Sequence, residues 1–305
     1  MEVAIRAERL QLAIAGIGIE LTSEGAQLAE EPVRQLYEPF LRSGPVDLAL
    51  RIHCGPLPSV MAEEVLFDGP ENRWRLSRAN GRYLFEIFGT KPPHPKAQVA
   101  LVECNLRTGE VYLEPQGPSR APMWSLVRLM RPLGELLLIH RLAQYRQGVM
   151  IHALGIEDRG QGLLFIGRSG AGKTTLANLY KEHGGVKILG DERVIVRRGD
   201  EGFVIAGTPW PGSFFEVSAD VVPLRRTFFI EHAPANVIIP DGVTTLLRLL
   251  FPQLFLPFWH GDSLAFALEF TEALLRSVPA ARLGFVNTPE VVAFLSKEVF
   301  DVGGD

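Results

Sequence analysis

The chain has 305 residues, a formal net charge of −4 and two cysteines, Cys54 and Cys104, which lie far apart in the sequence. Lys and Arg form no basic block, so nucleic acid and an anionic membrane are excluded as expected main partners. The cysteine usage excludes a disulfide framework and a zinc site, and a reducing, cytoplasmic location fits it. The length predicts two domains.

Two segments were candidates for membrane or export signals. The N-terminus carries Glu2 and Arg6 among its apolar positions, which a secretory signal peptide does not tolerate. Residues 244–259 form the most apolar stretch, but Pro252 and Pro257 interrupt it and it is too short to cross a bilayer. We therefore expect no membrane partner, and a buried or domain-packing helix and loop at 244–259.

The sequence of residues 1–120 predicts a β-rich accessory domain whose strands are mostly antiparallel. Short β-type runs are separated by turn residues, with turns expected at Asn80-Gly81 and Thr108-Gly109. Pro-rich segments at 91–96 and 115–122 punctuate the region, and the second is the better domain boundary. The runs lie at 3–7, 47–52, 73–77, 83–88, 99–104 and 110–115.

Residues 121–148 predict a linking helix, and residues 149–305 predict an α/β domain. Apolar residues recur at helical spacing in the linking segment, where Pro132 is expected to kink or split the helix. Beyond it, the pattern indicates strands at 149–156 and 162–167, a glycine-rich loop, and a helix from about Lys173 to Gly184. Three further strand-like runs follow, and the chain becomes helical again from about 242.

The glycine-rich loop matches the complete phosphate-binding pattern G-x-x-x-x-G-K-[ST]. Its glycines allow successive amide groups to face one anion, and the following helix adds its positive dipole end. Lys173 is expected to reach the β- and γ-phosphates of ATP, and Thr174 to ligate Mg²⁺. The alternative is a plain glycine turn between a strand and a helix. The predicted nucleotide-binding residues are Gly167, Arg168, Ser169, Gly170, Ala171, Gly172, Lys173, Thr174 and Thr175.

A pair of acids, Asp191 and Glu192, ends the next strand-like segment after the loop. The interval from 173 to 191 is short, which favours one compact strand-helix-strand unit. In transporter-type ATPases and helicases, by contrast, the strand that carries the acid lies much further along the sequence from the glycine-rich loop. The sequence contains neither an LSGGQ-like signature nor an N-K-x-D motif, so transporter ATPases and GTPases fit poorly.

At residues 149–240 the sequence resembles the HPr kinase/phosphorylase family, in particular its divergent kinase relatives. The shared pattern is Ile151-His152-Ala153, the loop GRSGAGKTT, and Gly190 to Val194 with its paired acid. The segment AGTPWPG at 206–212 adds to the resemblance. It implies a P-loop kinase domain of the HPr-kinase/carboxykinase-like type. The β-type runs of residues 1–120 add an N-terminal α+β domain rich in β-structure to the predicted fold.

The resemblance also implies roles for individual residues. Asp191 corresponds to the catalytic base, His152 to a residue that tunes this carboxylate, and Lys173 to the cation that holds the transferred phosphate. The expected metal ligands are Thr174, Asp191 and Glu192. For each of three residues a purely structural role stays open. Asp191 would then only end a strand, His152 would be a core residue, and Glu192 would be a solvated side chain beside Asp191.

Other residues remain ambiguous in the sequence. Arg168 either contacts phosphate or points to solvent, and Arg225 and Arg226 either supply transition-state charge or begin a solvated strand. Trp210 either stacks on an adenine ring or anchors an irregular loop. The other histidines are unassigned.

These features predict an ATP- and Mg²⁺-dependent kinase that phosphorylates a hydroxyl, most simply a serine on a small protein or peptide. Two alternatives stay open: a small-molecule kinase, and a non-catalytic ATP-binding regulator. A carboxykinase fits poorly because the chain is short. The acceptor's identity and homo-oligomer formation are left open.

Overall fold

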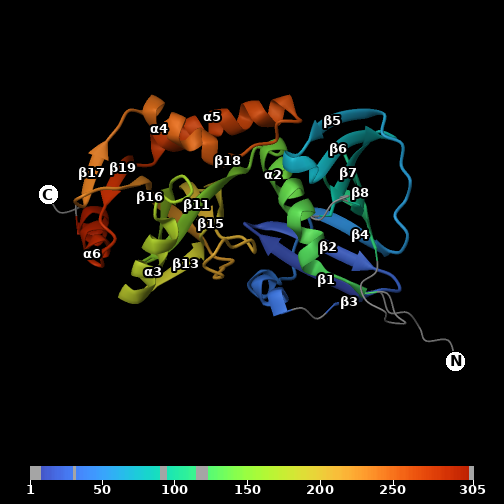
Figure 1. The fold of residues 1–305 in the computed structure, drawn as a ribbon, viewed down its shortest axis with the longest axis horizontal. Coiled ribbons are helices and arrows are strands. Elements are labelled where there is room, and N and C mark those ends of the chain that lie inside the picture. The colour runs from blue at the N-terminus through green and yellow to red at the C-terminus, as the bar shows by residue number, and fades with distance from the viewer. Residues whose placement is uncertain (1–7, 30–31, 90–94, 115–122, 302–305) are drawn as a thin grey trace. The chain divides into compact units, whose positions relative to one another are not determined.

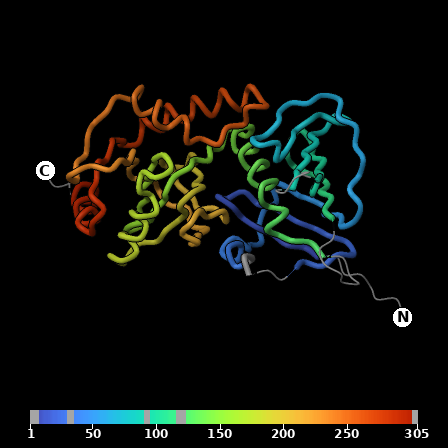
Figure 2. The backbone as a smooth tube through the Cα atoms, in the orientation of Figure 1, coloured from blue at the N-terminus to red at the C-terminus, as the bar shows by residue number. Residues whose placement is uncertain are grey.

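The computed structural model describes residues 8–29, 32–89, 95–114 and 123–301. The chain is a mixed α/β protein with two compact units (Figures 1 and 2). Met1–Arg141 and Phe258–His260 form the first unit, and Leu142–Pro257 and Gly261–Asp305 form the second. The boundary therefore falls at 141/142 rather than in the Pro-rich segment at 115–122, which lies outside the described residues. No described helix is long and apolar enough to cross a membrane.

The first unit is built on a mixed sheet. Its described strands are β1 (Glu8–Ile14), β2 (Ile17–Ser23), β4 (Leu48–Cys54), β5 (Glu64–Asp68), β6 (Trp74–Ala79), β7 (Arg82–Phe88), β8 (Lys96–Glu103) and β9 (Thr108–Leu113). They lie in the order β1-β2-β4-β9-β8-β7-β6-β5. The pairs β2–β4 and β4–β9 are parallel and the other neighbours are antiparallel, which agrees with a mostly antiparallel module. A short parallel pair joins β3 (Gln27–Leu28) to β10 (Met123–Trp124), and 3-10 turns occupy η1 (Pro32–Phe40) and η2 (Pro70–Asn72).

Of the two predicted turns in this unit, one is confirmed and one is wrong. Asn80 and Gly81 have φ values of 51° and 71° and join β6 to β7 as a tight hairpin. Thr108 and Gly109 lie inside β9, and the turn that precedes it contains Asn105 and Leu106. There the amide of Arg107 donates to Oδ1 of Asn105 at 3.0 Å, so an Asn side chain rather than the Thr-Gly pair makes the turn. The run predicted at 3–7 lies outside the described residues.

The linking segment is helical and Pro132 does interrupt it. Helix α1 (Leu126–Leu129) continues through a π-helical stretch, η3 (Met130–Gly134), into α2 (Glu135–Gln144). Arg131 has φ −129° and ψ 112°, values outside the helical region, as expected because proline disfavours the α conformation at the residue before it.

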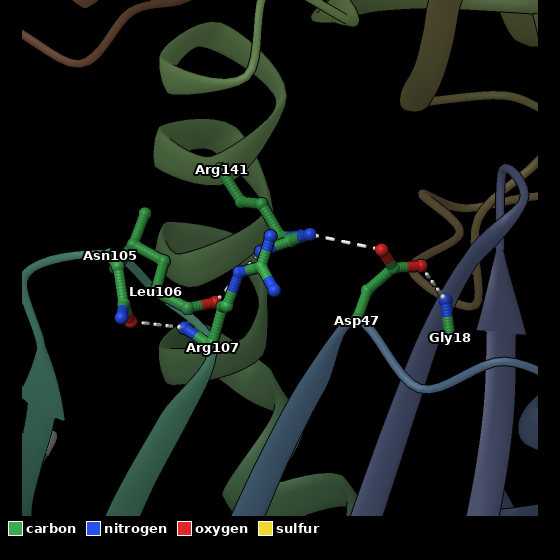
Figure 3. A network of polar contacts seen from close by, with 6 residues as sticks. All are labelled: Gly18, Asp47, Asn105, Leu106, Arg107 and Arg141. Atoms are coloured by element: carbon green, nitrogen blue, oxygen red, sulfur yellow. Dashed lines mark hydrogen bonds and ion pairs between the residues drawn. The ribbon is translucent and has the colours of Figure 1, made fainter.

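A buried arginine ties α2 to the sheet of the first unit, as Figure 3 shows. The Arg141 side chain is 3% exposed. Its Nη1 donates to the carbonyl of Leu106 at 2.9 Å, and its Nη2 donates to Oδ1 of Asp47 at 3.0 Å. The other carboxylate oxygen of Asp47 accepts from the amide of Gly18 at 3.0 Å. One guanidinium therefore connects the helix to the turn before β9 and to the segment before β4.

The second unit contains long strands that take part in two sheets, with helices on both faces. Its strands are β11 (Gly148–Asp158), β12 (Gln161–Ile166), β13 (Val186–Gly190), β14 (Arg193–Gly199), β15 (Gly202–Ala206), β16 (Val221–His232), β17 (Val237–Pro240), β18 (Leu254–Phe255) and β19 (Ala280–Phe285). Its helices are α3 (Lys173–His183), α4 (Val243–Leu250), η4 (Phe251–Gln253), α5 (Gly261–Ser277), α6 (Glu290–Ser296) and η5 (Lys297–Asp301). Helix α3 ends at the predicted Gly184, whose φ is 80°.

Strand β11 passes from one sheet into the other. Residues 148–152 pair with β14, and residues 153–158 pair with β12. Strand β13 pairs with the opposite edge of the same part of β11, so the loop-bearing sheet has the order β13-β11-β12-β16-β19-β17. The loop-bearing sheet is therefore mixed, with antiparallel and parallel pairs. Strands β12 and β13 run in the same direction, but β11 lies between them because Arg159 and Gly160, both with positive φ, fold β11 and β12 into a hairpin.

The core explains why β12 is apolar at consecutive positions. Leu163 and Phe165 belong to a cluster that includes residues of α3 and α6, whereas Leu164 and Ile166 belong to a cluster with α4 and α5. Side chains alternate across a strand, so a strand covered on both faces needs apolar residues throughout. In Figure 1, α4 and α5 lie on one side of this unit and α3 lies on the other. Because β12 is packed on both faces, its end is held in place, and the glycine-rich loop begins there.

Candidate functional site

The glycine-rich loop, residues 167–174, connects the end of β12 to the first turn of α3. Gly170 and Gly172 have φ values of 81° and 100°, which disfavour other residues. A Cβ on Gly172 would also lie 2.6 Å from the ring of Phe285, and one on Gly167 would lie 2.8 Å from Ala171 and from Ile230. The glycines are therefore required both by conformation and by packing. The exposed loop lies at the N-terminus of an eleven-residue helix, a site suited to anions.

Lys173 is the first residue of α3, and its side chain folds back over the loop. Its Nζ donates to the carbonyls of Gly167 at 2.6 Å and Arg168 at 3.4 Å. Burial lowers the pKa of Lys173, while the negative charges of Glu192 and Asp191 raise it. The residue is only 8% exposed. The structure thus places the predicted phosphate-binding cation near the predicted acids.

Asp191 follows β13 and is 4% exposed. Its Oδ1 accepts from the amide of Gly212 at 2.7 Å, and its Oδ2 accepts from the amide of Phe214 at 2.9 Å. A carboxylate has about four acceptor positions, so these two bonds orient the group and leave acceptor capacity for a ligand. Gly212 is packed tightly against it: an added Cβ would lie 2.8 Å from Oδ2 of Asp191 and 3.1 Å from Oε2 of Glu192.

Glu192 and His152 lie in the same region because β11, which carries His152, pairs with β14, which begins directly after Glu192. Oε1 of Glu192 is paired with Nη1 of Arg193 at 2.7 Å. His152 lies opposite Arg193, where β11 passes from one sheet to the other. Burial lowers the pKa of the His152 imidazole, as does the nearby charge of Lys173, whereas the charge of Glu192 and a hydrogen bond to the side chain of Gln253 raise it. The imidazole is therefore neutral near pH 7.

A polar cavity of about 450 Å³ brings these groups together. Every predicted catalytic and metal-binding residue lines it, as does most of the predicted nucleotide-binding loop. Four further residues were not predicted from the sequence: Gly212, Ser213, His232 and Asn287. Its lining is His152, Ser169, Gly170, Gly172, Lys173, Thr174, Thr175, Asp191, Glu192, Gly212, Ser213, His232 and Asn287.

Two of the additional residues, Ser213 and His232, contact the glycine-rich loop directly. Oγ of Ser213 lies 3.3 Å from Oγ1 of Thr174, with either hydroxyl able to donate. Nε2 of His232 lies 3.2 Å from the carbonyl oxygen of Gly170. Ser213 directly follows the AGTPWPG segment, which forms part of the family resemblance, so a motif next to Ser213 could have pointed to it. No sequence motif pointed to Asn287, because it comes from the turn after β19, far along the sequence from the glycine-rich loop.

A second cavity of about 630 Å³ adjoins the first and shares Ser169, Gly170 and His232 with it. Arg168, Arg248 and Arg282 line this cavity, which also has an apolar part that includes Leu249. Arg168 is exposed, and its side chain belongs to this neighbouring cavity rather than to the first. Arg282 is paired with Asp241 at 2.5 Å and with Glu231 at 3.3 Å.

Three residues with suggested roles lie elsewhere. Arg226 pairs with Leu163, which lies at the end of β12 away from the loop. Nη1 of Arg226 donates to the carbonyl of Glu298 at 2.9 Å. Arg225, the preceding residue, is exposed in the same part of β16. Trp210 is 1% exposed and lines neither cavity, which supports its alternative role as a packing anchor.

The cavity residues fit a magnesium nucleotide. Mg²⁺ in nucleotide sites takes one or two carboxylates or hydroxyls from protein, and phosphate and water oxygens supply the other positions. Thr174, Asp191 and Glu192 offer this donor set around one cavity. In the part of the chain that the structure describes, no group of three His, Cys, Asp or Glu side chains forms an all-protein metal site.

Comparison with known families and proteins gives no match: no protein-family model matches the chain, and no curated protein matches its sequence.

Proposed function

We propose that the second unit is a P-loop kinase domain that binds MgATP and transfers the γ-phosphoryl group to a hydroxyl. The single observation that carries this proposal is the shared cavity, in which the glycine-rich loop, Lys173, the acids Asp191 and Glu192, and His152 all meet. Transfer of a phosphoryl group requires an anion cradle, a cation and a carboxylate in one place. The proposed acceptor is a serine of a small protein or peptide.

The loop and α3 would bind the triphosphate. The glycine-rich loop and the N-terminus of α3 favour an anion. Lys173 would exchange its bonds to the carbonyls of Gly167 and Arg168 for bonds to phosphate oxygens. Thr174, Asp191 and Glu192 would hold Mg²⁺, which supplies neutralisation of the charge that develops on the phosphate oxygens.

Asp191 would accept the proton of the attacking hydroxyl. Two backbone amides fix its carboxylate, so little reorganisation is needed at the moment of reaction. His152, neutral through burial, adds no competing positive charge beside the base. Lys173 would stabilise the charge on the transferred group.

The order of elements also supports a kinase of the HPr-kinase-like type. A histidine-bearing strand (β11) precedes the loop-bearing strand (β12), and the paired acid follows the next strand (β13). The hairpin β11–β12 brings His152 to the same end of the sheet as the loop, because Ala153 pairs with Ile166. The sequence resemblance and this arrangement therefore favour the same reaction class.

A small-molecule kinase is a second candidate, and the adjoining cavity of about 630 Å³ favours it. A space of this size matches pockets for small ligands. Arg168 and Arg248 in its lining would suit an acceptor that carries a carboxylate or phosphate besides the reacting hydroxyl.

A transfer assay tests the proposal. Purified protein is incubated with γ-labelled ATP and Mg²⁺ together with two sets of acceptors, serine peptides and small hydroxyl compounds. The native chain should label a member of one set, and Lys173→Ala should label none. MgATP binding without labelling of any hydroxyl, in an acceptor or in the chain itself, would instead support the regulator interpretation.

A further inference from the structure

The loop after the Pro-Trp-Pro segment is held against the catalytic acid. The amides of Gly212 and Phe214 both donate to the Asp191 carboxylate, at 2.7 Å and 2.9 Å. Ser213 lies between these two amides, so its backbone is fixed beside the carboxylate. Trp210, fully buried, anchors the chain before this point. Glu216, paired with Lys181 of α3, anchors it after.

The Ser213 side chain lies beside the phosphate-binding loop. Its Oγ is 3.3 Å from Oγ1 of Thr174, the last residue of the glycine-rich loop. It lines the same cavity as Lys173, whose Nζ would hold the β- and γ-phosphates. Ser213 itself is exposed, so its hydroxyl faces the cavity and not the core.

The other hydroxyls of the cavity have different positions. Ser169 belongs to the turn of the glycine-rich loop, and Thr174 and Thr175 belong to the first turn of α3, where they surround the phosphate-binding amides. Among the residues that the structure describes, Ser213 is the cavity hydroxyl contributed by a separate segment. The amides on either side of it, those of Gly212 and Phe214, bind Asp191, the proposed base.

We propose that Ser213 is an autophosphorylation site, modified by the active site of its own chain. This inference rests on the proposed function. Oγ of Ser213 attacks the γ-phosphorus of bound ATP, and a new O–P bond forms as the bond from that phosphorus to the β–γ bridging oxygen breaks. ADP leaves, and the hydroxyl proton passes to the Asp191 carboxylate. The products are ADP and phosphoserine, and no oxidant or further reactant is required.

The first test locates the phosphate. Native protein is incubated with MgATP, its intact mass is followed, and the modified residue is identified by fragmentation. The expected result is one phosphoryl group on Ser213, absent from Ser213→Ala and retained by Ser213→Thr, which keeps a hydroxyl. Ser277→Ala removes an exposed serine at the end of α5, outside the cavity, and should be labelled like the native chain. A native chain that carries no phosphate on Ser213 overturns the proposal.

A mixing experiment tests whether transfer occurs within one chain. Lys173→Ala retains Ser213 but lacks the phosphate-binding cation, whereas Ser213→Ala retains the cation but lacks the acceptor. A mixture of the two should leave Ser213 of the first variant unmodified, and the native rate should not depend on protein concentration. Labelling of the Lys173→Ala chain in the mixture would contradict transfer within one chain.

The two proposals fail differently. A native chain that transfers phosphate to added hydroxyl compounds but leaves Ser213 unmodified contradicts only the autophosphorylation site. A native chain that does not bind MgATP contradicts the proposed function and the modification together.

Discussion

A Cβ atom on Gly212 would lie 2.8 Å from Oδ2 of Asp191, which is closer than carbon and oxygen approach without displacement. We therefore predict that Gly212→Ala shifts either the loop or the carboxylate and lowers phosphoryl transfer by roughly tenfold to a hundredfold. MgATP affinity should change much less, because the phosphate-binding loop is untouched. Steady-state transfer and calorimetric binding measure the two effects.

The control for that substitution is Gly242→Ala. Gly242 precedes α4 with φ −73°, and an added Cβ there meets no atom within 4 Å. Its transfer rate should equal that of the native chain. A Gly212→Ala protein as active as Gly242→Ala would show that the close contact with Asp191 has no catalytic importance.

Lys173→Ala should weaken MgATP binding strongly. The substitution removes a nearly buried cation that lies over the glycine-rich loop and near the acids. Hydrogen bonds between a cation and phosphate are among the strongest in proteins, so a loss of about tenfold to a hundredfold in affinity is expected. Isothermal titration calorimetry measures it. Unchanged affinity would mean that the loop does not bind the phosphates.

Thr174→Ala should reduce the dependence of nucleotide binding on Mg²⁺. The Thr174 hydroxyl lies on the cavity side of α3, beside Ser213. In native protein, ATP should bind more tightly with Mg²⁺ than with a chelator present, and the variant should narrow that difference. The same titration with and without the metal provides the measurement. Equal native affinities in both conditions would argue against a metal ligand at this position.

The first unit contains a histidine whose burial makes stability depend on pH. Burial lowers the pKa of His140 from 6.5 to about 3, and Nε1 of Trp259 donates to its Nδ1 at 3.1 Å. The unfolded chain thus binds a proton at higher pH than the folded chain. The associated stability is complete above about pH 6.5 and is lost as the pH falls towards 3.

Urea unfolding at pH 7 and pH 4.5 measures this effect. The contribution from His140 should fall by about 2 to 3 kcal/mol between the two values. His140→Asn keeps an acceptor close to the position of Nδ1 but cannot take up the proton, so its stability should decrease less on acidification. Equal decreases in the native chain and the variant would contradict a buried neutral histidine.

Local patterns predicted much of the second unit. The continuous apolar run of β12 reflects burial on both faces, and the glycines of residues 167–174 meet conformational and packing requirements visible in the structure. The end of α3 at Gly184 follows from local capping geometry. The acids at 191 and 192 could be located because they directly follow an apolar strand.

Long-range features were not predictable from those patterns. The position of β11 between β12 and β13 depends on strand pairing, which no local pattern encodes. The return of Phe258–His260 to the first unit depends on contacts such as that between Trp259 and His140, far apart in the sequence. Ser213 enters the site through a loop whose amides bind Asp191, a contact between segments far apart in the sequence.

The most direct test of the proposed kinase is Asp191→Asn, measured for MgATP binding and for phosphoryl transfer on the same preparation. Asparagine keeps an acceptor for one of the two loop amides but cannot act as the base. Because Asp191 is also a proposed ligand of Mg²⁺, the mechanism predicts a small loss of MgATP affinity but a transfer rate lower by roughly a hundredfold or more, whether the acceptor is Ser213 or an added hydroxyl compound. A variant that transfers phosphate as fast as the native chain would contradict the role of Asp191 and the mechanism built on it.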